Sequence, residues 1–328
     1  MPLRREDLSR HDAGIQTLNR HHMTDTPLHW DAESLWEQLT VPLPGLSVEV
    51  VARIASTNTA LLERARIVSE PVHDDGAAVL VRRSVESAAF GRRSADLQPC
   101  LLVAEQQTAG RGRQGRVWQA TPGASLTFSL ALPLAPADWS GLSLAMGAAL
   151  ADALDAAPPG ARRLGVKWPN DLWLMDEALP ASAAGGRKLG GILIETVGAG
   201  SQRLAVIGVG LNVLPLQASE ATTGVASVQE LDPQASAPLV LARVALPLVQ
   251  ALKQFERDGF GAFAERFAAR DVLRGRTVRT TQPDVPEGVA QGVAANGALR
   301  VQTPDGVVQL VSSGEVSVRL NPGADAPC

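Results

Sequence analysis

Residues 110–116 alternate glycine with arginine, and the segments 101–104 and 126–132 on either side of them are apolar and strand-like. Glycine lets the backbone approach a ligand closely and expose its N–H groups, and arginine adds a planar cation suited to phosphate or carboxylate. A solvated basic loop is the usual fate of such a charge run. Three arginines spaced by glycines between two strands instead predict a loop that closes over an anion.

The glycines of this loop also match the pattern G-x-G-x-x-G, but their context excludes the nucleotide folds that use it. The dinucleotide fingerprint must open a helix, whereas residues 121–123 read Thr-Pro-Gly and a strand-like run follows. A protein kinase needs a histidine in its catalytic loop, and no histidine follows His73. Because all five histidines lie in the first quarter of the chain, a Ser-His-Asp mechanism in the core is excluded as well.

The composition is typical of a folded protein of the reducing cytoplasm. With 328 residues, of which 45% are hydrophobic and 20% charged, the chain is long enough for one large domain and a small one. A net charge of −4 gives no general attraction to nucleic acid or membrane. Two cysteines make no disulfide framework, and no apolar run reaches the length of a transmembrane helix. We therefore expect a cytoplasmic location.

Hydrophobic periodicity predicts an α+β fold in which helices and strands are mixed along the chain. From residue 272 the texture changes to short alternating strands with the hairpin turns Asn296-Gly297 and Asp305-Gly306, which favours a small appended barrel. The predicted helices are 32–39, 56–67, 142–154, 239–255 and 261–270, and the predicted strands before the barrel are 48–54, 101–104, 126–132, 166–168, 172–175, 189–196 and 204–213.

These elements divide into a tail with a short helix (1–45), a main domain (46–270) and a C-terminal domain (271–322). Residues 69–99 interrupt the main domain with turn-rich sequence, which indicates an insertion. Met23 is an alternative translation start, and the sequence leaves that choice open.

Four further segments accompany the glycine–arginine loop, and in this order the five resemble biotin protein ligase, the enzyme that attaches biotin to carboxyl-carrier domains. The segments are Ser56-Thr57-Asn58, Lys167-Trp168-Pro169-Asn170-Asp171-Leu172, Arg187-Lys188-Leu189-Gly190-Gly191-Ile192-Leu193-Ile194-Glu195 and Gly208-Val209-Gly210-Leu211-Asn212-Val213. The resemblance covers residues 48–320. It implies a mixed-sheet catalytic domain of the biotin/lipoate ligase type and a small C-terminal SH3-like β-barrel.

The resemblance also implies the reaction and its participants. Biotin and Mg-ATP first give biotinyl-5′-AMP and pyrophosphate. A lysine of the biotin carboxyl carrier protein of acetyl-CoA carboxylase, or of a related biotin-dependent carboxylase, then takes the biotinyl group. The expected cofactors are biotin, ATP and Mg²⁺, with the metal held by the ATP phosphates and no metal site of the protein's own. The expected assembly is a monomer or homodimer without a DNA or membrane partner.

By the same resemblance, the catalytic residues are Lys188, Arg111, Arg113, Asp171 and Lys167. Two anions, the biotin carboxylate and the α-phosphate, must meet in the first step, so cations have to offset their repulsion. Asp171 is the hypothesised acceptor of the carrier lysine's proton. The residues expected to bind biotin and ATP are Ser56, Thr57, Asn58, Gln107, Gly110, Arg111, Gly112, Arg113, Trp118, Asn170, Lys188, Gly190, Gly191 and Asn212.

Each assignment also has a purely structural alternative. Ser56 would cap any helix, and a Lys167–Asp171 pair at the surface would contribute little to stability. Gly190 would allow close packing of strands, and Asn212 would serve as a turn residue. In the C-terminal domain, the positions that face the nucleotide in some relatives are matched by Glu315 and Arg319.

Two other functions stay open at this point. One is a lipoate or octanoate ligase or transferase of the same superfamily, and the other is a non-catalytic biotin sensor. The pairing of the glycine–arginine loop with Lys-Trp-Pro-Asn-Asp at 167–171 favours biotin. The segment between Met23 and the first core strand is too short for a winged helix. We therefore expect a ligase-only form without an N-terminal DNA-binding domain.

Overall fold

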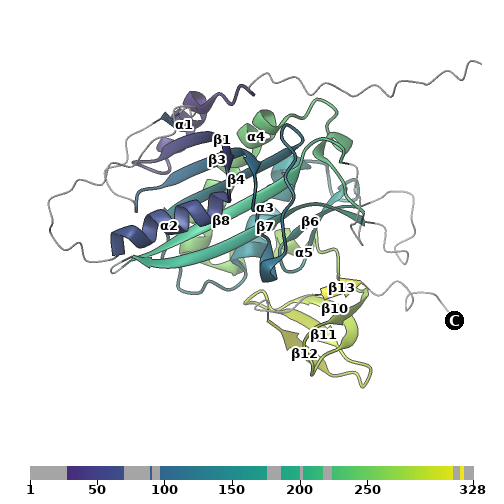
Figure 1. The fold of residues 1–328 in the computed structure, drawn as a ribbon. Coiled ribbons are helices and arrows are strands. Elements are labelled where there is room, and N and C mark those ends of the chain that lie inside the picture. Colours follow the sequence, from purple (N-terminus) through teal and green to yellow (C-terminus); the bar gives the residue numbers. More distant parts are fainter. Residues whose placement is uncertain are drawn as a thin grey trace, which may run out of the picture.

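The computed structural model describes residues 28–69, 89–90, 97–175, 186–199, 202–216, 224–312 and 318–320. Within them, an eight-stranded mixed sheet with helices on both faces forms the main body, and a five-stranded antiparallel sheet forms a smaller unit beside it (Figure 1). Most of the predicted tail 1–45 and of the predicted insertion 69–99 lies outside the described residues, so both, like the predicted domain boundaries, stay predictions.

The large sheet has the strand order β2-β1-β3-β4-β8-β7-β6-β5. Its strands are β1 (Ser47–Ile54), β2 (Ala89–Phe90), β3 (Cys100–Gln107), β4 (Ser125–Pro133), β5 (Leu164–Lys167), β6 (Asp171–Met175), β7 (Gly186–Ala199) and β8 (Gln202–Asn212). β1 and β3 run parallel, and every other neighbouring pair is antiparallel. β6 pairs with β7 only as far as Gly191, and the glycine–arginine loop, which follows β3, contacts β7 beyond that point, where Arg111 meets Glu195.

Helices cover both faces of this sheet because its strands alternate their apolar side chains. In β3, Leu101 and Val103 join the main core, whereas Cys100 and Leu102 pack with Leu61 of the second helix on the opposite face. The helices are α1 (Ala32–Thr40), α2 (Thr57–Ser69), α3 (Leu142–Leu154), α4 (Ala237–Asp258) and α5 (Ala264–Ala268), with 3-10 turns η1 (Arg113–Gly115), η2 (Val228–Glu230) and η3 (Phe260–Phe263).

One predicted helix is not a single helix in the structure. The segment 261–270 was expected to be a single helix, but it divides into the 3-10 turn η3 and the short helix α5. Phe260 and Phe263, three residues apart, are both buried. A 3-10 turn eclipses side chains at this spacing and so directs both rings to the same core.

The C-terminal unit is the small antiparallel sheet that the alternating sequence predicted. Its strands are β9 (Thr277–Thr280), β10 (Glu287–Val293), β11 (Leu299–Gln302), β12 (Val308–Val311) and β13 (Val318–Leu320), in the order β12-β11-β10-β9-β13. The turns expected at Asn296-Gly297 and Asp305-Gly306 are present, with φ of 77° at Gly297 and 86° at Gly306. Glycine adopts this left-handed conformation without the cost that a Cβ would add. The α+β class and its two-part architecture are therefore confirmed.

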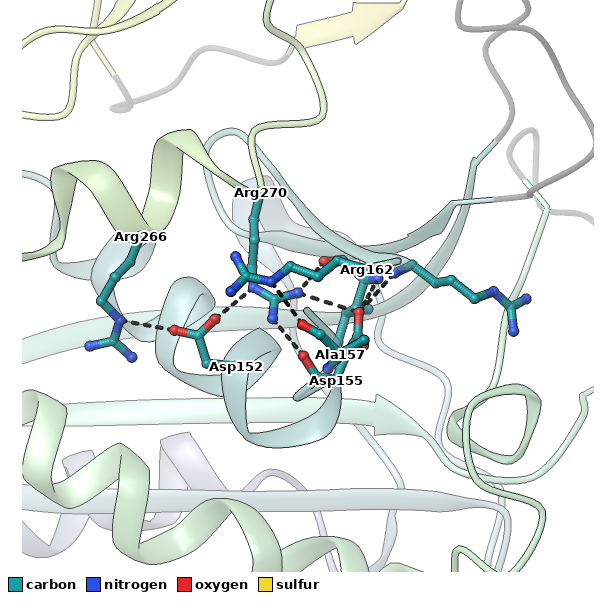
Figure 2. Close-up of polar contacts among 8 residues, drawn as sticks. Asp152, Asp155, Ala157, Arg162, Arg266 and Arg270 are labelled. Carbon is teal, nitrogen blue, oxygen red and sulfur yellow. Dashed lines mark hydrogen bonds and ion pairs between the residues drawn. The ribbon is translucent and has the colours of Figure 1, made fainter. Parts of the chain in front are cut away.

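A buried ionic cluster fixes the chain just before it enters the C-terminal unit (Figure 2). Arg270, whose side chain is 1% exposed, donates to Asp152 at 2.7 Å, to the Asp155 carbonyl at 2.6 Å and to the Leu164 carbonyl at 2.7 Å. Arg266 donates to the other oxygen of Asp152 at 2.9 Å. Because one guanidinium spans the end of α3 and the start of β5, the cluster joins these elements to the segment after α5.

The link between the two units then runs along β5. Val166 donates its N–H to the Arg270 carbonyl at 2.7 Å, and Val272 donates to the Val166 carbonyl at 3.1 Å. Asp271 forms a parallel bridge with Val166 between them. The next residue of β5 is Lys167, so the C-terminal unit is fixed within one residue of a predicted site residue.

Candidate active site

The predicted site residues converge on a cavity of about 650 Å³ at the edge of the large sheet. Its walls come from the start of α2, the glycine–arginine loop, the β5–β6 turn, β7, β8 and the last strand of the C-terminal unit. Among the predicted residues, those that line it are Ser56, Thr57, Asn58, Gln107, Arg111, Gly112, Arg113, Trp118, Lys167, Asn170, Asp171, Lys188 and Gly191.

Three predicted residues lie behind the cavity wall. A Cβ on Gly110 would overlap the Trp118 carbonyl, and a Cβ on Gly190 would lie 2.5 Å from the Gly210 carbonyl. Both glycines thus allow two backbone segments to approach each other. Asn212 is buried and donates to the carbonyls of Ala226 at 3.2 Å and Lys188 at 3.4 Å. It ties residues 224–226 to β7 at Lys188.

One end of the cavity is a buried wall of neutral polar groups. Thr57 donates both its N–H, at 2.7 Å, and its hydroxyl, at 3.1 Å, to Oε1 of Gln107. The hydroxyl of Ser129 on β4 lies 2.6 Å from Thr57 Oγ1 and 2.6 Å from Asn58 Oδ1. Ser56 accepts the Thr59 N–H at 3.4 Å, as a helix cap does. These hydrogen bonds hold each wall group in one orientation.

The other end of the cavity is charged. Lys188 on β7 donates to Asp171 on β6 at 2.8 Å, and its Nζ lies 6.0 Å from the centroid of the Trp118 ring. The lysine side chain keeps 35% of its surface exposed and the aspartate 20%. The Lys188 backbone also pairs with residues 224–226, which cross beside it. A cation with this much exposure can still bind an anion that enters the cavity.

Lys167 connects this charged end to the C-terminal unit. Its Nζ donates to the Val318 carbonyl on β13 at 2.8 Å and lies 5.2 Å from the centroid of the Trp173 ring. The neighbouring Trp168 is fully buried and donates its indole N–H to the Gly297 carbonyl at 3.0 Å. Burial lowers the pKa of Lys167, and the positive charge of Lys188 adds to that effect, while Asp171 opposes it.

Arg113 and Asn170 close the side of the cavity between the two ends. Arg113 donates to Asn170 Oδ1 at 3.4 Å, and Asn170 donates to the Ile192 carbonyl at 2.8 Å. Burial lowers the pKa of Arg113 against the opposing charge of Asp171, but a guanidinium keeps its proton in proteins. Arg113 is therefore a fixed cation above the cavity.

Arg111 has different partners from Arg113. Its guanidinium donates to Glu195 Oε1 on β7 at 2.9 Å and to Thr59 Oγ1 on α2 at 3.1 Å. The loop itself is a tight hairpin, in which Gly112 donates to the Arg116 carbonyl at 2.7 Å. The loop is thus fixed at its tip by its own backbone and at its flank by Arg111.

Two segments of the sequence match models of known protein families. Residues 91–212 match the model of the Biotin/lipoate A/B protein ligase family, and residues 275–319 match the Biotin protein ligase C terminal domain. The Biotin--[acetyl-CoA-carboxylase] ligase of Mycobacterium tuberculosis is 33% identical over 306 residues, which are 87% of this chain and 94% of that protein. The chain belongs to the biotin protein ligase family. It is a biotin ligase enzyme by that membership.

Other biotin ligases support the same assignment. The Bifunctional ligase/repressor BirA of Escherichia coli is 32% identical over 86% of this chain and 77% of its own length, and that of Salmonella typhimurium is 35% identical over 66% of each. The structure of a biotin protein ligase from Aquifex aeolicus in complex with biotin and ATP superimposes with a TM-score of 0.61. At 23% identity, over 84% of this chain and 99% of that one, this likeness concerns the fold.

Several residues in or beside this cavity were not predicted from the sequence. Ser129 and Glu195 join the polar contacts of the wall, and Trp173 and Val318 line the cavity. A signal existed for two of them, because Ser129 repeats Thr127 at strand spacing in an apolar run and Glu195 interrupts another such run. Arg319 lines the cavity as expected, whereas Glu315 lies outside the described residues.

Among the residues that the structure describes, no three His, Cys, Asp or Glu side chains gather into a cluster that could hold a metal ion. None of the described helices is long and apolar enough to cross a membrane.

Proposed function

We propose that this biotin ligase activates biotin with Mg-ATP and transfers the biotinyl group to a lysine of a biotin carboxyl carrier protein. The observation that carries this proposal is the two-ended cavity, neutral and polar at Ser56–Asn58 and cationic at Lys188 and Arg113. Biotin has the matching two-ended shape, with a neutral ureido ring and a carboxylate. The carrier of acetyl-CoA carboxylase is the proposed substrate because the Mycobacterium tuberculosis relative bears that name.

The neutral end would bind the ureido ring. A ureido group offers two N–H donors and one carbonyl acceptor, so a binding wall needs both kinds of group. Ser56 can donate its hydroxyl proton, and Gln107 presents its amide N–H₂ beside an oxygen that Thr57 already holds. A lipoyl ring has no N–H or carbonyl and would leave the buried Ser56 hydroxyl and the half-buried Gln107 amide without a ligand partner, which costs about 1–3 kcal/mol for a fully buried group. The wall therefore favours biotin over lipoate.

The charged end would carry out the first reaction. A carboxylate oxygen of biotin attacks the α-phosphorus of ATP, the bond to the β-phosphate oxygen breaks, and pyrophosphate leaves. No proton moves, so the required assistance is electrostatic, and Lys188 and Arg113 supply it at the cavity wall. The Mg²⁺ ion would enter with the ATP phosphates and neutralise the leaving group. Trp118, 6.0 Å from Lys188 Nζ, offers an aromatic face at this end.

In the second reaction, the amine of the carrier lysine attacks the acyl carbon, the bond to the phosphate oxygen breaks, and AMP leaves. The amine must lose a proton, since a free lysine is protonated at neutral pH. Asp171 is the proposed acceptor, because its carboxylate lines the cavity 2.8 Å from Lys188. Asp171 would take the ammonium proton so that the free amine can attack, and the second proton, which the nitrogen sheds as the amide forms and AMP leaves, would pass to solvent.

A second hollow offers the carrier lysine a route to the adenylate. Its volume is about 460 Å³, and it shares Arg113, Asn170 and Ile192 with the main cavity. It continues along β7 past Thr196, beyond the last residue of β7 that pairs with β6. We expect Thr196→Arg to slow transfer from preformed biotinyl-AMP while pyrophosphate release in the first step continues at the wild-type rate.

The whole proposal is tested by mass spectrometry. The protein is incubated with biotin, Mg-ATP and a carboxyl-carrier domain, and parallel reactions contain lipoate or octanoate in place of biotin. One added biotinyl group on the carrier, dependent on ATP, is the expected result. Modification by lipoate or octanoate at an equal rate would contradict the assignment of the neutral wall. An unmodified carrier in every reaction would contradict the transfer function itself.

A further inference from the structure

Glu195 lies between the neutral wall and the glycine–arginine loop and contacts both. Its Oε2 accepts a hydrogen bond from Asn58 Nδ2 at 3.0 Å, and its Oε1 accepts one from Arg111 at 2.9 Å. Each carboxylate oxygen thus has a separate partner, one on the wall and one on the loop. Glu195 itself is only 24% exposed at its side chain. It does not line the cavity and would not touch a ligand there.

The contact with Asn58 fixes an amide that is fully engaged by the protein. Asn58 is buried, its Nδ2 also donates to the Leu193 carbonyl at 3.2 Å, and its Oδ1 lies 2.6 Å from the Ser129 hydroxyl. Gly208 supplies the space for this amide, because a Cβ there would overlap Asn58 Oδ1. The orientation of Asn58 is therefore set by its protein partners, with Glu195 as the charged one.

The contact with Arg111 fixes the loop. Gly110 and Gly112 flank Arg111 and bond across the hairpin to Trp118 and Arg116, so the contact of Arg111 with Glu195 fixes the position of this hairpin against the main body. An ion pair whose arginine is 47% exposed contributes little stability by itself, because water screens it. Its effect is positional, since Glu195 on β7 and Thr59 on α2 hold one guanidinium from two directions.

A continuous chain of hydrogen bonds connects the wall to the loop beside the cavity. Gln107, the last residue of β3, accepts from Thr57, and the hydrogen bonds continue through the wall to Glu195 and return to the loop at Arg111. The two ends of the segment 107–111 are thus connected through the wall. A ligand that orders the wall would also order the loop, because both depend on the same contacts.

We propose that Glu195 is a positioning residue that holds the glycine–arginine loop over the cavity through Arg111 and orients Asn58 in the wall. Arg111 is then a loop anchor, and Arg113 and Lys188 are the cations that face the carboxylate and phosphate. The inference rests on the proposed function, because the loop's task would be to retain biotinyl-AMP until a carrier arrives. Its experiment uses added biotinyl-AMP, so that it does not depend on synthesis.

The two contacts of Glu195 can be separated by substitution. In Glu195→Gln, one side-chain oxygen remains to accept from Asn58, but the amide N–H₂ then faces the donors of Arg111, so only the loop contact is lost. Glu195→Ala removes both contacts. We expect Glu195→Gln to release biotinyl-AMP about tenfold faster than the wild type while biotin affinity changes by less than about twofold. We expect Glu195→Ala to release it as fast and also to weaken biotin binding.

The measurement follows labelled biotinyl-AMP as it leaves the protein into an excess of unlabelled compound, with biotin affinity determined by calorimetry. Arg111→Ala should release biotinyl-AMP at least as fast as Glu195→Gln, because it also loses the hydrogen bond to Thr59, and the double variant Arg111→Ala/Glu195→Gln should be no faster than Arg111→Ala, because the Arg111–Glu195 contact is already gone. Arg243→Ala is the matched control, since it removes an ion pair of similar exposure, Arg243–Asp232, on the surface. It should retain biotinyl-AMP like the wild type.

Two results would overturn the inference alone. One is release of biotinyl-AMP from Glu195→Gln at the wild-type rate, and the other is a double variant in which the two single effects multiply. A wild-type protein that does not bind added biotinyl-AMP would overturn the proposed function together with it. Trypsin cleavage after Arg113 and Arg116 gives a second readout of the loop, and it should be faster in Glu195→Gln with biotinyl-AMP bound.

Discussion

At the neutral end of the cavity, Thr57, Asn58 and Ser129 are buried and hold one another through uncharged hydrogen bonds within the main body. At the charged end, Lys188 and Asp171 stay partly exposed, and Lys167 makes its hydrogen bond to the C-terminal unit. The hydrogen bonds of the neutral end all lie within the main body. The charged end also needs the C-terminal unit, because Lys167 bonds to Val318 on β13. The difference suggests that the neutral end determines binding of biotin and that the charged end determines the rate of its chemistry.

The largest expected effect comes from removing the central cation of the charged end. Lys188→Ala should lower the rate of adenylate formation by about 100- to 1,000-fold, the usual effect of losing one preorganised electrostatic group. Pyrophosphate release at saturating biotin and Mg-ATP measures it. Lys253→Ala removes a lysine from a surface ion pair with Glu256 and serves as the control. Pyrophosphate release at the wild-type rate in Lys188→Ala would break the comparison.

The next effect concerns Asp271, which lies in the link between the main body and the C-terminal unit. Burial raises the pKa of Asp271 to about 6 from an ordinary value of 3.8, although the Leu273 N–H donates to it at 2.9 Å. The folded state thus binds this proton more tightly than the unfolded chain does. The contribution of protonated Asp271 to the free energy of unfolding is therefore fully present below pH 4 and is lost as the pH rises through 6. The loss amounts to at most about 3 kcal/mol.

Asp271→Asn, which cannot ionise, should remove this slope. Urea unfolding between pH 4 and pH 7 measures it, and the difference in stability between variant and wild type should move in favour of the variant as the pH rises. A difference that is constant with pH would contradict the buried, proton-binding state of Asp271. It would also mean that the link to the charged end is not sensitive to ionisation at this residue.

At the neutral end, Ser129→Ala should act on binding. The variant leaves Thr57 and Asn58 short of a hydroxyl partner, which corresponds to an increase of about 10- to 30-fold in the KM for biotin. The kcat at saturating biotin should stay within about twofold of the wild type, because the chemistry occurs at the other end. Ser236→Ala, at a helix start where the hydroxyl makes no capping bond, is the control. A fall in kcat with an unchanged KM for biotin would contradict this assignment, because it would mean that the neutral end acts on the chemistry and not on binding.

The smallest expected effect tests the contact between the C-terminal unit and the charged end. Lys167→Met keeps the length of the buried side chain but loses the hydrogen bond to the Val318 carbonyl. It should raise the KM for ATP by about tenfold and leave the KM for biotin unchanged. Arg300→Met, on an exposed position of β11, is the control. An equal rise in both KM values would indicate that Lys167 supports the whole cavity.

Much of this site could be predicted from the sequence because its groups occur in short local runs. Ser56–Asn58 begins helix α2, and 110–118 and 167–171 each lie in or around one turn, so the residues of each run stay together in space as they do in the chain. Apolar alternation likewise identified the strands that carry them. The division of residues 260–268 into a 3-10 turn and a short α-helix escaped prediction, because the two have similar apolar spacing.

The contacts that escaped prediction join distant segments. Glu195 meets Asn58 and Arg111 only because α2 and the loop both lie beside β7 in the folded sheet. Lys167 was predicted to act in catalysis, and nothing local in the sequence shows that it reaches Val318, 151 positions away. Such pairings depend on strand order and on where the C-terminal unit docks, and a single sequence does not encode either in a local pattern. The functional roles of the site residues stay predictions until they are measured.

The measurement that tests the division of the cavity most directly is a calorimetric titration of Lys188→Ala with biotin, beside the wild type. If biotin binding depends mainly on the neutral wall, Lys188→Ala should bind biotin within about threefold of the wild-type affinity, because Arg113 still faces the carboxylate, although the variant scarcely forms biotinyl-AMP. Loss of biotin binding in Lys188→Ala, in parallel with the loss of adenylate formation, would contradict the account.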